Sequence, residues 1–159
     1  PSTTGEIWNK SASDVSDAAG ALHLNVNESA GDKLNFNFYH LTGGLTFQCT
    51  DPDALTTGMW HHVAGVRYGN TVTLYKNGIA VASQAYDQTI PVMTGHARIS
   101  QRSYTTGYGY WDGYIDELAV TKGEAKYTEN FTPAKSAFPI TNIVVVDDNG
   151  GEYKLGRNW

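Results

Sequence analysis

The chain has 159 residues and is poor in cysteine, in proline, in basic side chains and in long apolar runs. Its one cysteine cannot form an internal disulfide, which excludes a disulfide-built scaffold. No apolar run approaches the ~20 residues that span a bilayer, so we expect no membrane partner. Lys and Arg total 11 against 16 Asp and Glu, for a net charge of −5, and the basic residues are scattered singly. Nucleic-acid binding needs a basic patch, so we expect no nucleic-acid partner either.

Short runs in which apolar and polar residues alternate are the main feature that the chain does have. They occur at residues 20–26, 33–39, 45–49, 97–100 and 114–120, with polar turns between them. Such alternation predicts half-buried β-strands, and no stretch longer than a turn or two has a helical period. With 17 glycines and only five prolines, the sequence predicts one all-β domain, built as a two-sheet sandwich or jelly roll.

A tight hairpin is predicted at Asn77-Gly78, where the strand pattern of residues 71–76 ends. Both turn residues tolerate the positive φ that a two-residue hairpin loop requires. The preceding residues 59–66 read Met-Trp-His-His-Val-Ala-Gly-Val. A Trp-His strand followed by a Leu-Tyr-x-Asn-Gly turn is similar to the central hairpin of laminin-G-like domains.

The segment 110–133 carries a second and stronger similarity. Its first half has apolar residues on a strand pattern interrupted by Asp116-Glu117, and its second half reads Thr-Lys-Gly-x-Ala-Lys-Tyr-Thr-x-Asn-Phe-Thr-Pro. This run resembles the closing segment of laminin-G-like, concanavalin-A-like jelly-roll domains, and its tail resembles the version found in phage tail and virion-surface proteins. The resemblance implies a two-sheet jelly-roll sandwich.

The core of this sandwich can be predicted from strand parity, because alternate residues of a strand face the same way. The residues on the apolar parity of their strands are Trp60, Leu74, Ile115, Leu118 and Val120. We predict that they form the core shared by the two sheets. Cys49 also shares parity with its apolar neighbours, so we expect it to be buried as a small apolar residue.

Asp116 is the candidate metal ligand. Adjacent residues of a strand point to opposite faces, so only one of Asp116 and Glu117 can face inward. The family resemblance implies that Asp116 can help to hold a structural Ca²⁺, an ion that prefers hard oxygen ligands. A carboxylate that is hydrogen-bonded to turn amides is the alternative, and the sequence leaves both open.

We expect no catalytic residues. Retaining glycosidases need two carboxylates roughly 5 Å apart, and the Glu-x-Asp-x-Glu triplet of related glucanases is absent. A Gly-x-Ser-x-Gly elbow is also absent. His61 and His62 diverge as strand neighbours and lack further zinc ligands at a suitable spacing, and His23 is isolated in the sequence.

The segment 101–110 is the candidate ligand-binding loop, because Tyr and Gly together present rigid amphipathic rings on an adaptable backbone. Tyr104 and Tyr108 are the predicted contacts, and Arg102 can add hydrogen bonds to a glycan. Tyr110 and Trp111 are expected to pack into the core instead.

Both ends of the chain depart from the family pattern. The first plausible strand is at residues 6–8, so we expect at least one opening strand of the family pattern to be missing. Residues 143–146 and 152–155 flank a Gly-rich turn and predict a short β-hairpin. We therefore divide the chain into a jelly-roll domain, 1–139, and a C-terminal β-hairpin extension, 140–159. The hairpin is expected to fill the gap by strand addition, on its own sheet or on a neighbouring subunit.

These expectations combine into one hypothesis about function. The chain is a non-catalytic module on a virion surface, in a tail fibre, a tail-associated protein or a capsid decoration. Its partners are a glycan or host-surface receptor and other virion subunits, and it forms a homo-oligomer. The alternative is an extracellular carbohydrate-binding or adhesion module of a cellular organism.

Overall fold

The computed structural model describes residues 4–11, 20–40, 45–102, 109–135, 143–146 and 152–155. The large sheet has five strands in the order β4-β3-β2-β1-β8, and the small sheet has three in the order β5-β6-β7. The large sheet consists of β1 (Thr4–Ser11), β2 (Ala21–Asn27), β3 (Lys33–Tyr39), β4 (Leu45–Ala54) and β8 (Ala97–Ile99), with the short 3-10 helix η2 (Glu28–Ala30) after β2. The small sheet consists of β5 (Val63–Tyr68), β6 (Thr71–Lys76) and β7 (Ile79–Ala85). All neighbouring strands are antiparallel.

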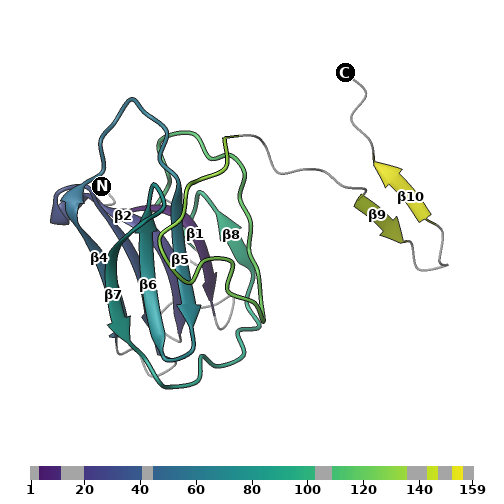
Figure 1. The fold of residues 1–159 in the computed structure, drawn as a ribbon, viewed down its shortest axis with the longest axis horizontal. Helices are drawn as coiled ribbons and strands as arrows, with labels where there is room; N and C mark the ends of the chain where they lie inside the picture. The colour runs from purple at the N-terminus through teal and green to yellow at the C-terminus, as the bar shows by residue number, and fades with distance from the viewer. Residues whose placement is uncertain are drawn as a thin grey trace.

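The two sheets stack face to face as a sandwich (Figure 1). This confirms the predicted all-β jelly-roll fold. Along one side of the sandwich the edge strands β4 and β7 meet, where the backbone N–H of Gln48 donates to the side-chain oxygen of Gln84 at 3.0 Å. Among the described residues, no helix has the length and apolar character needed to cross a membrane.

The core lies between the sheets and is built from alternate residues of the facing strands. Its fully buried members include Leu34, Phe38, Phe47, Val72 and Leu74. Gly65 of β5 also faces this core, because a Cβ there would lie 2.4 Å from the Phe36 ring. Leu74 and Cys49 are buried as predicted, and burial raises the pKa of the Cys49 thiol to about 11.

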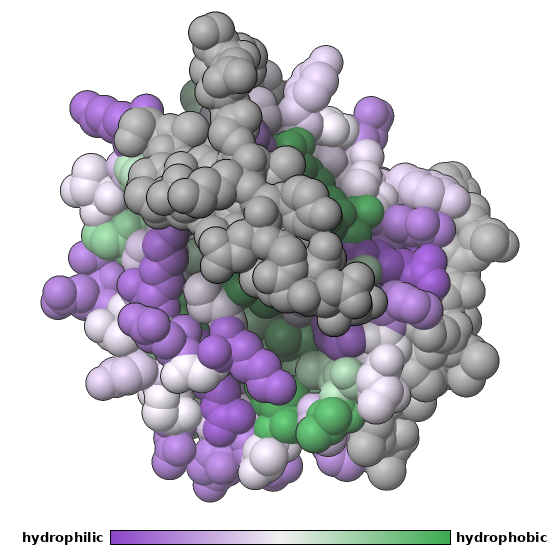
Figure 2. Space-filling model, turned by 90° about the vertical axis from the view of Figure 1, so that its right-hand side faces the viewer, coloured by the Kyte–Doolittle hydropathy of each residue, from purple (hydrophilic) through white to green (hydrophobic). Residues whose placement is uncertain are grey.

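Three of the predicted core residues are instead at the surface. Trp60 is 67% exposed, Val120 is 63% exposed, and Leu118 is also exposed, so their assignment to the core was wrong. Ile115 is partly buried against the core, as predicted. Figure 2 shows the side that lies to the right in Figure 1, where hydrophobic residues reach the surface between hydrophilic ones.

The misassignment has a local cause, because residues 114–120 do not form the predicted strand. Glu117 has a φ of +51°, which is incompatible with a strand. Its N–H donates to Asp116 Oδ1 at 2.8 Å, so this amide is satisfied locally and not by a neighbouring strand. Trp60 likewise precedes β5, and its ring packs against that of Tyr114 at 6.4 Å.

Residues 122–133, which we call the strap, pack across the small sheet. The rings of Tyr127 and Phe131 stack almost in parallel, with centroids 3.6 Å apart. Both rings also contact Tyr75 of β6 and the imidazole of His62. Burial lowers the pKa of His62, and the nearby Lys126 lowers it further, so the neutral imidazole is the form that fits this cluster.

The strap backbone binds the turn between β6 and β7. The N–H of Phe131 donates to the carbonyl of Gly78 at 2.8 Å, and the N–H of Ala80 donates to the Asn130 side chain at 2.8 Å. Gly78 has a φ of +82°, and a Cβ on it would lie 1.9 Å from the carbonyl oxygen of Phe131. The hairpin around Asn77-Gly78 and the segment 110–133, which both resemble the family, are therefore in contact with each other.

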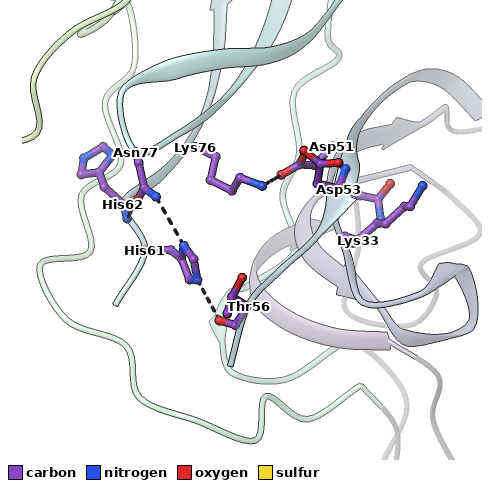
Figure 3. Close-up of polar contacts among 9 residues, drawn as sticks. Lys33, Asp51, Asp53, Thr56, His61, His62, Lys76 and Asn77 are labelled. Carbon is purple, nitrogen blue, oxygen red and sulfur yellow. Dashed lines mark hydrogen bonds and ion pairs between the residues drawn. The ribbon is translucent and has the colours of Figure 1, made fainter. Parts of the chain in front are cut away.

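The Asn-Gly turn also holds the segment that leads into β5. Asn77 has a φ of +53°, as the predicted hairpin requires, and its Oδ1 accepts a hydrogen bond from the backbone N–H of His62 at 2.9 Å. His61 lies between Asn77 and Thr56, with its Nε2 2.8 Å from the Thr56 carbonyl oxygen (Figure 3).

One ion pair joins the two sheets. Lys76 of β6 reaches Asp51 of β4, with Nζ 2.5 Å from Oδ2 (Figure 3). Asp51 is fully buried and its Oδ1 accepts the N–H of Asp53, whereas the Lys76 side chain is 18% exposed. Loss of the ion pair would thus leave the Asp51 carboxylate as a buried charge, whereas the Lys76 side chain can still reach water.

The C-terminal segment forms the predicted hairpin, with β9 (Ile143–Val146) antiparallel to β10 (Glu152–Leu155). It is a separate sheet and is hydrogen-bonded to neither sheet of the sandwich. We expected the hairpin to add either to a sheet of its own domain or to a neighbouring subunit. For the described strands, addition to a sheet of its own domain is therefore wrong. The first strand β1 is not an open edge, since it lies between β2 and β8.

Replacing Gly78 with Ala should displace the strap, because the added Cβ overlaps the Phe131 carbonyl. Gly31→Ala is a matched control, since Gly31 has the same φ of +82° and nothing within 4 Å of its Cβ position. We expect Gly78→Ala to lower the free energy of unfolding by at least about 2 kcal/mol more than Gly31→Ala does. Equal losses in chemical denaturation would show that the strap contributes nothing to stability.

Breaking the inter-sheet ion pair should have unequal costs. Lys76→Met leaves the buried Asp51 carboxylate unpaired and should cost about 3 kcal/mol or more. Asp51→Asn preserves the shape and leaves a lysine that can reach water, so it should cost less than half of that. A larger loss for Asp51→Asn in the same denaturation experiment would contradict the assignment of Asp51 as the dependent partner.

Candidate ligand-binding site

The outer face of the large sheet is polar, although most of it is buried. The register places Gln48, Asn37, His23, Asn9 and Arg98 opposite one another in one row across all strands of the sheet. A parallel row contains Thr50, Asn35, Asn25 and Glu6. Glu6, Asn9, His23 and Asn35 are at most 1% exposed. Buried polar groups are costly unless they are hydrogen-bonded, so these rows need partners.

A β-bulge in β1 places Glu6 in this face. The register of β1 against β2 shifts between Glu6 and Trp8, so that Glu6 lies opposite Asn25 and Asn9 lies opposite His23. Without the extra residue, Glu6 and Asn9 would point to opposite faces of the sheet. Ile7, at the bulge, packs into the core instead.

Glu6 and His23 form a buried pair at the centre of the face. His23 Nδ1 lies 3.1 and 3.2 Å from the two carboxylate oxygens of Glu6, and both side chains are 1% exposed. The ring of Tyr39 packs edge-on against the imidazole, with centroids 5.9 Å apart. Within the described part of the chain, His23 Nε2 is buried and has no hydrogen-bond partner.

The two asparagines of β3 differ in how they are satisfied. Asn35 Oδ1 accepts hydrogen bonds from Thr50 at 2.6 Å and from Gln48 at 3.1 Å, and its Nδ2 donates to the Lys33 carbonyl. Asn37 Oδ1 is buried with no partner among the described residues. The unsatisfied atoms are thus concentrated in the row that contains His23.

A pocket of about 70 Å³ opens at this point of the sheet. The described residues that line it are all polar or carry a polar tip, and they are Thr4, Glu6, His23, Asn25, Asn27, Asn37, Tyr39, Gln48 and Arg102. A carboxylate, an imidazole, amides, hydroxyls and a guanidinium converge here. Such a set can bind a small hydroxyl-rich group through several hydrogen bonds.

The structure joins part of the predicted ligand-binding loop to this pocket. Arg102 lines it, and the carbonyl of Gln101 accepts a hydrogen bond from Asn9. At the other end of the loop, the carbonyl of Gly109 accepts the N–H of Glu6 at 3.1 Å. Tyr104 and Tyr108 lie outside the described residues, but the loop that carries them starts and ends beside Glu6.

Asp116, the predicted Ca²⁺ ligand, is exposed and lies in the irregular segment after β8. Its Oδ1 accepts the N–H of Glu117, which is the alternative role that the sequence left open. Among the described residues, no three His, Cys, Asp or Glu side chains are grouped to hold a metal. A Ca²⁺ at Asp116 would therefore take most of its ligands from backbone carbonyls and water.

Sequence reasoning missed the centre of the site. His23 was set aside as isolated, yet it has a carboxylate partner 17 residues away on the adjacent strand. A usable signal was present, because Asn occupies alternate positions of β2 and β3 although Asn is disfavoured in strands. The bulge that adds Glu6 to this face leaves no such signal.

A second hollow lies on the outer face of the small sheet, beside the strap. It has a volume of about 190 Å³ and is lined by Val66, Tyr68, Thr71, Thr73, Tyr75, Tyr127 and Thr128. None of the described residues that line it is charged. It therefore offers fewer polar groups than the pocket on the large sheet.

Comparison with known families agrees with the all-β sandwich fold. Residues 2–129 match the family model of the concanavalin A-like lectin/glucanases superfamily. The chain belongs to this superfamily. The match includes every strand of both sheets of the sandwich, and it confirms the laminin-G-like resemblance. The superfamily's description joins lectins with glucanases, so membership leaves both binding and catalysis open.

Among solved structures, the chain is similar to an S-layer domain-containing protein from Clostridium thermocellum ATCC 27405. The identity is 24% and the TM-score is 0.38, over 76% of this chain and 58% of that one. The chain thus spans a little over half the length of that structure. A comparison with curated proteins gives no match.

Proposed function

We propose that this superfamily member is a non-catalytic binding module that holds a glycan on the outer face of its large sheet. The observation that carries the proposal is the buried Glu6–His23 pair, in which His23 lines a polar pocket and its Nε2 has no partner among the described residues. A sugar offers several hydroxyls, each of which both donates and accepts hydrogen bonds. It can therefore satisfy several of these side chains at once.

The loop at residues 103–108 supplies the second part of the proposed site. Tyr104 and Tyr108 would contact the ligand with their rings, because an aromatic face suits the apolar face of a sugar. Arg102 already lines the pocket and would mark the boundary between the polar base and the aromatic rim.

Two observations favour binding over glycoside cleavage. Glu6 is the only carboxylate among the lining residues of the described pocket, whereas retaining and inverting glycosidases both need two. Both oxygens of Glu6 also face His23, so neither is aimed at a scissile bond. Asp116 is exposed in a separate segment.

For the biological setting, we propose a virion surface, with a host glycan or receptor and neighbouring virion subunits as partners. The support is the resemblance of the strap sequence to phage tail and virion-surface proteins. In a homo-oligomer, the β9–β10 hairpin would add to an edge strand of the next subunit. An extracellular adhesion module of a cellular organism is the alternative, and neighbouring genes that encode virion proteins would decide between them.

Substitutions in the loop test the binding site. Tyr104→Ala and Tyr108→Ala should each weaken glycan binding about tenfold without lowering the thermal midpoint, because each removes a ring that would stack on the sugar. Tyr68→Ala is the control, since Tyr68 is exposed and belongs to β5 of the other sheet. Titration on a glycan array is the measurement, and unchanged affinity in both loop variants would remove the loop from the site.

The proposed Ca²⁺ at Asp116 has an independent test. A metal bound only by the native state stabilises it by mass action, so a chelator should lower the thermal midpoint. Asp116→Ala should abolish this sensitivity, whereas Asp112→Ala, an exposed Asp of the same segment, should retain it. A midpoint that does not respond to chelator in the unsubstituted protein rejects the metal.

A further inference from the structure

The Glu6–His23 pair fixes which nitrogen of the imidazole carries the proton. An ionised carboxylate can only accept, so the contacts of 3.1 and 3.2 Å assign the imidazole proton to Nδ1. In the neutral imidazole Nε2 is then an acceptor. Because Nε2 is buried with no partner among the described residues, it is available for a donor from a ligand.

The charges around Nε2 also restrict the ligand. The Glu6 carboxylate is fully buried, lines the pocket and contacts the other nitrogen of the same imidazole. Arg102 lines the pocket but is already engaged in another contact. Arg98 belongs to the same row of residues as His23. Asn9 lies between the two, and Arg98 is on the edge strand β8. Among the described residues, Glu6 is thus the charged group in direct contact with the imidazole, and Arg102 lines the same pocket.

From these two observations we infer that His23 is a specificity-determining residue that selects uncharged sugars. A sugar hydroxyl donates to Nε2, and Glu6 acts as a positioning residue that holds the imidazole in the accepting tautomer. A carboxylate or sulfate group has no proton to donate at neutral pH, and it would lie next to the Glu6 carboxylate. This inference rests on the proposed glycan-binding function and names the class of glycan.

The test compares pairs of oligosaccharides that share a backbone and differ in one sialic acid, uronic acid or sulfate at the terminal residue. We expect the whole protein to bind the neutral member about tenfold more tightly, since an acidic group leaves the buried Nε2 acceptor without a donor. In parallel, nitrogen chemical shifts of the His23 ring should show the proton on Nδ1.

Glu6→Gln gives the matched variant. A glutamine amide can donate to Nδ1, which moves the imidazole proton to Nε2 and turns the acceptor into a donor. The preference for neutral sugars should then fall at least fivefold, and the ring shifts should report the other tautomer. Glu28→Gln makes the same chemical change at an exposed position and should leave both readouts unaltered.

The outcomes separate the inference from the proposed function. A preference for acidic oligosaccharides, or a proton on Nε2 in the unsubstituted protein, overturns the role of His23 while glycan binding survives. Binding to no oligosaccharide of either class overturns both. The sugar pairs and the ring shifts of the unsubstituted protein decide the matter even if Glu6→Gln does not fold.

Discussion

A polar side chain that is removed from water must find a hydrogen-bond partner, and the outer face of the large sheet is built from such side chains. The inner face of the same strands forms the apolar core, so strands β2 and β3 are buried on both sides. Some of the polar groups pair with one another, as Asn35 does with Thr50 and Gln48. Within the described part of the chain, His23 Nε2 and Asn37 Oδ1 have no partner, and this difference defines the proposed site.

The rest of the fold keeps this sheet in place. The small sheet packs on its inner face, the Asp51–Lys76 pair crosses between the sheets, and the strap is bound to the turn at Gly78. Each contact joins segments that are far apart in the sequence. The pocket is therefore carried by strands that cannot shift independently, and the candidate loop at 101–110 is anchored to β1 at both ends. Such rigidity lowers the entropy cost of binding a ligand.

Much of this fold was predictable, because alternation and turn residues act locally. The runs at 20–26 and 33–39 became β2 and β3, and Asn77-Gly78 formed the predicted turn. The prediction for residues 114–120 was wrong because one hydrogen bond within the segment, from Glu117 to Asp116, replaces the pairing of a strand. The alternation of apolar residues cannot reveal that competition.

The site was less predictable than the fold, since its main contact depends on register. Glu6 meets His23 only because β1 pairs with β2 and because a bulge shifts β1 by one residue. Arg102 was predicted as a ligand contact from the composition of its loop, and it lines the pocket together with Glu6, but its contact with a ligand stays a prediction. The Asn residues at alternate positions of β2 and β3 would also have predicted a polar outer face.

The central claim is that a sugar binds on the outer face of the large sheet. The most direct test is to titrate into the whole protein an oligosaccharide that it binds, and to record the changes in backbone and side-chain NMR shifts. The account predicts that the largest changes fall on His23, Asn25 and Asn37 and on the adjacent loop. Changes confined to the hollow beside Tyr68 and Tyr127, on the opposite sheet, would contradict it.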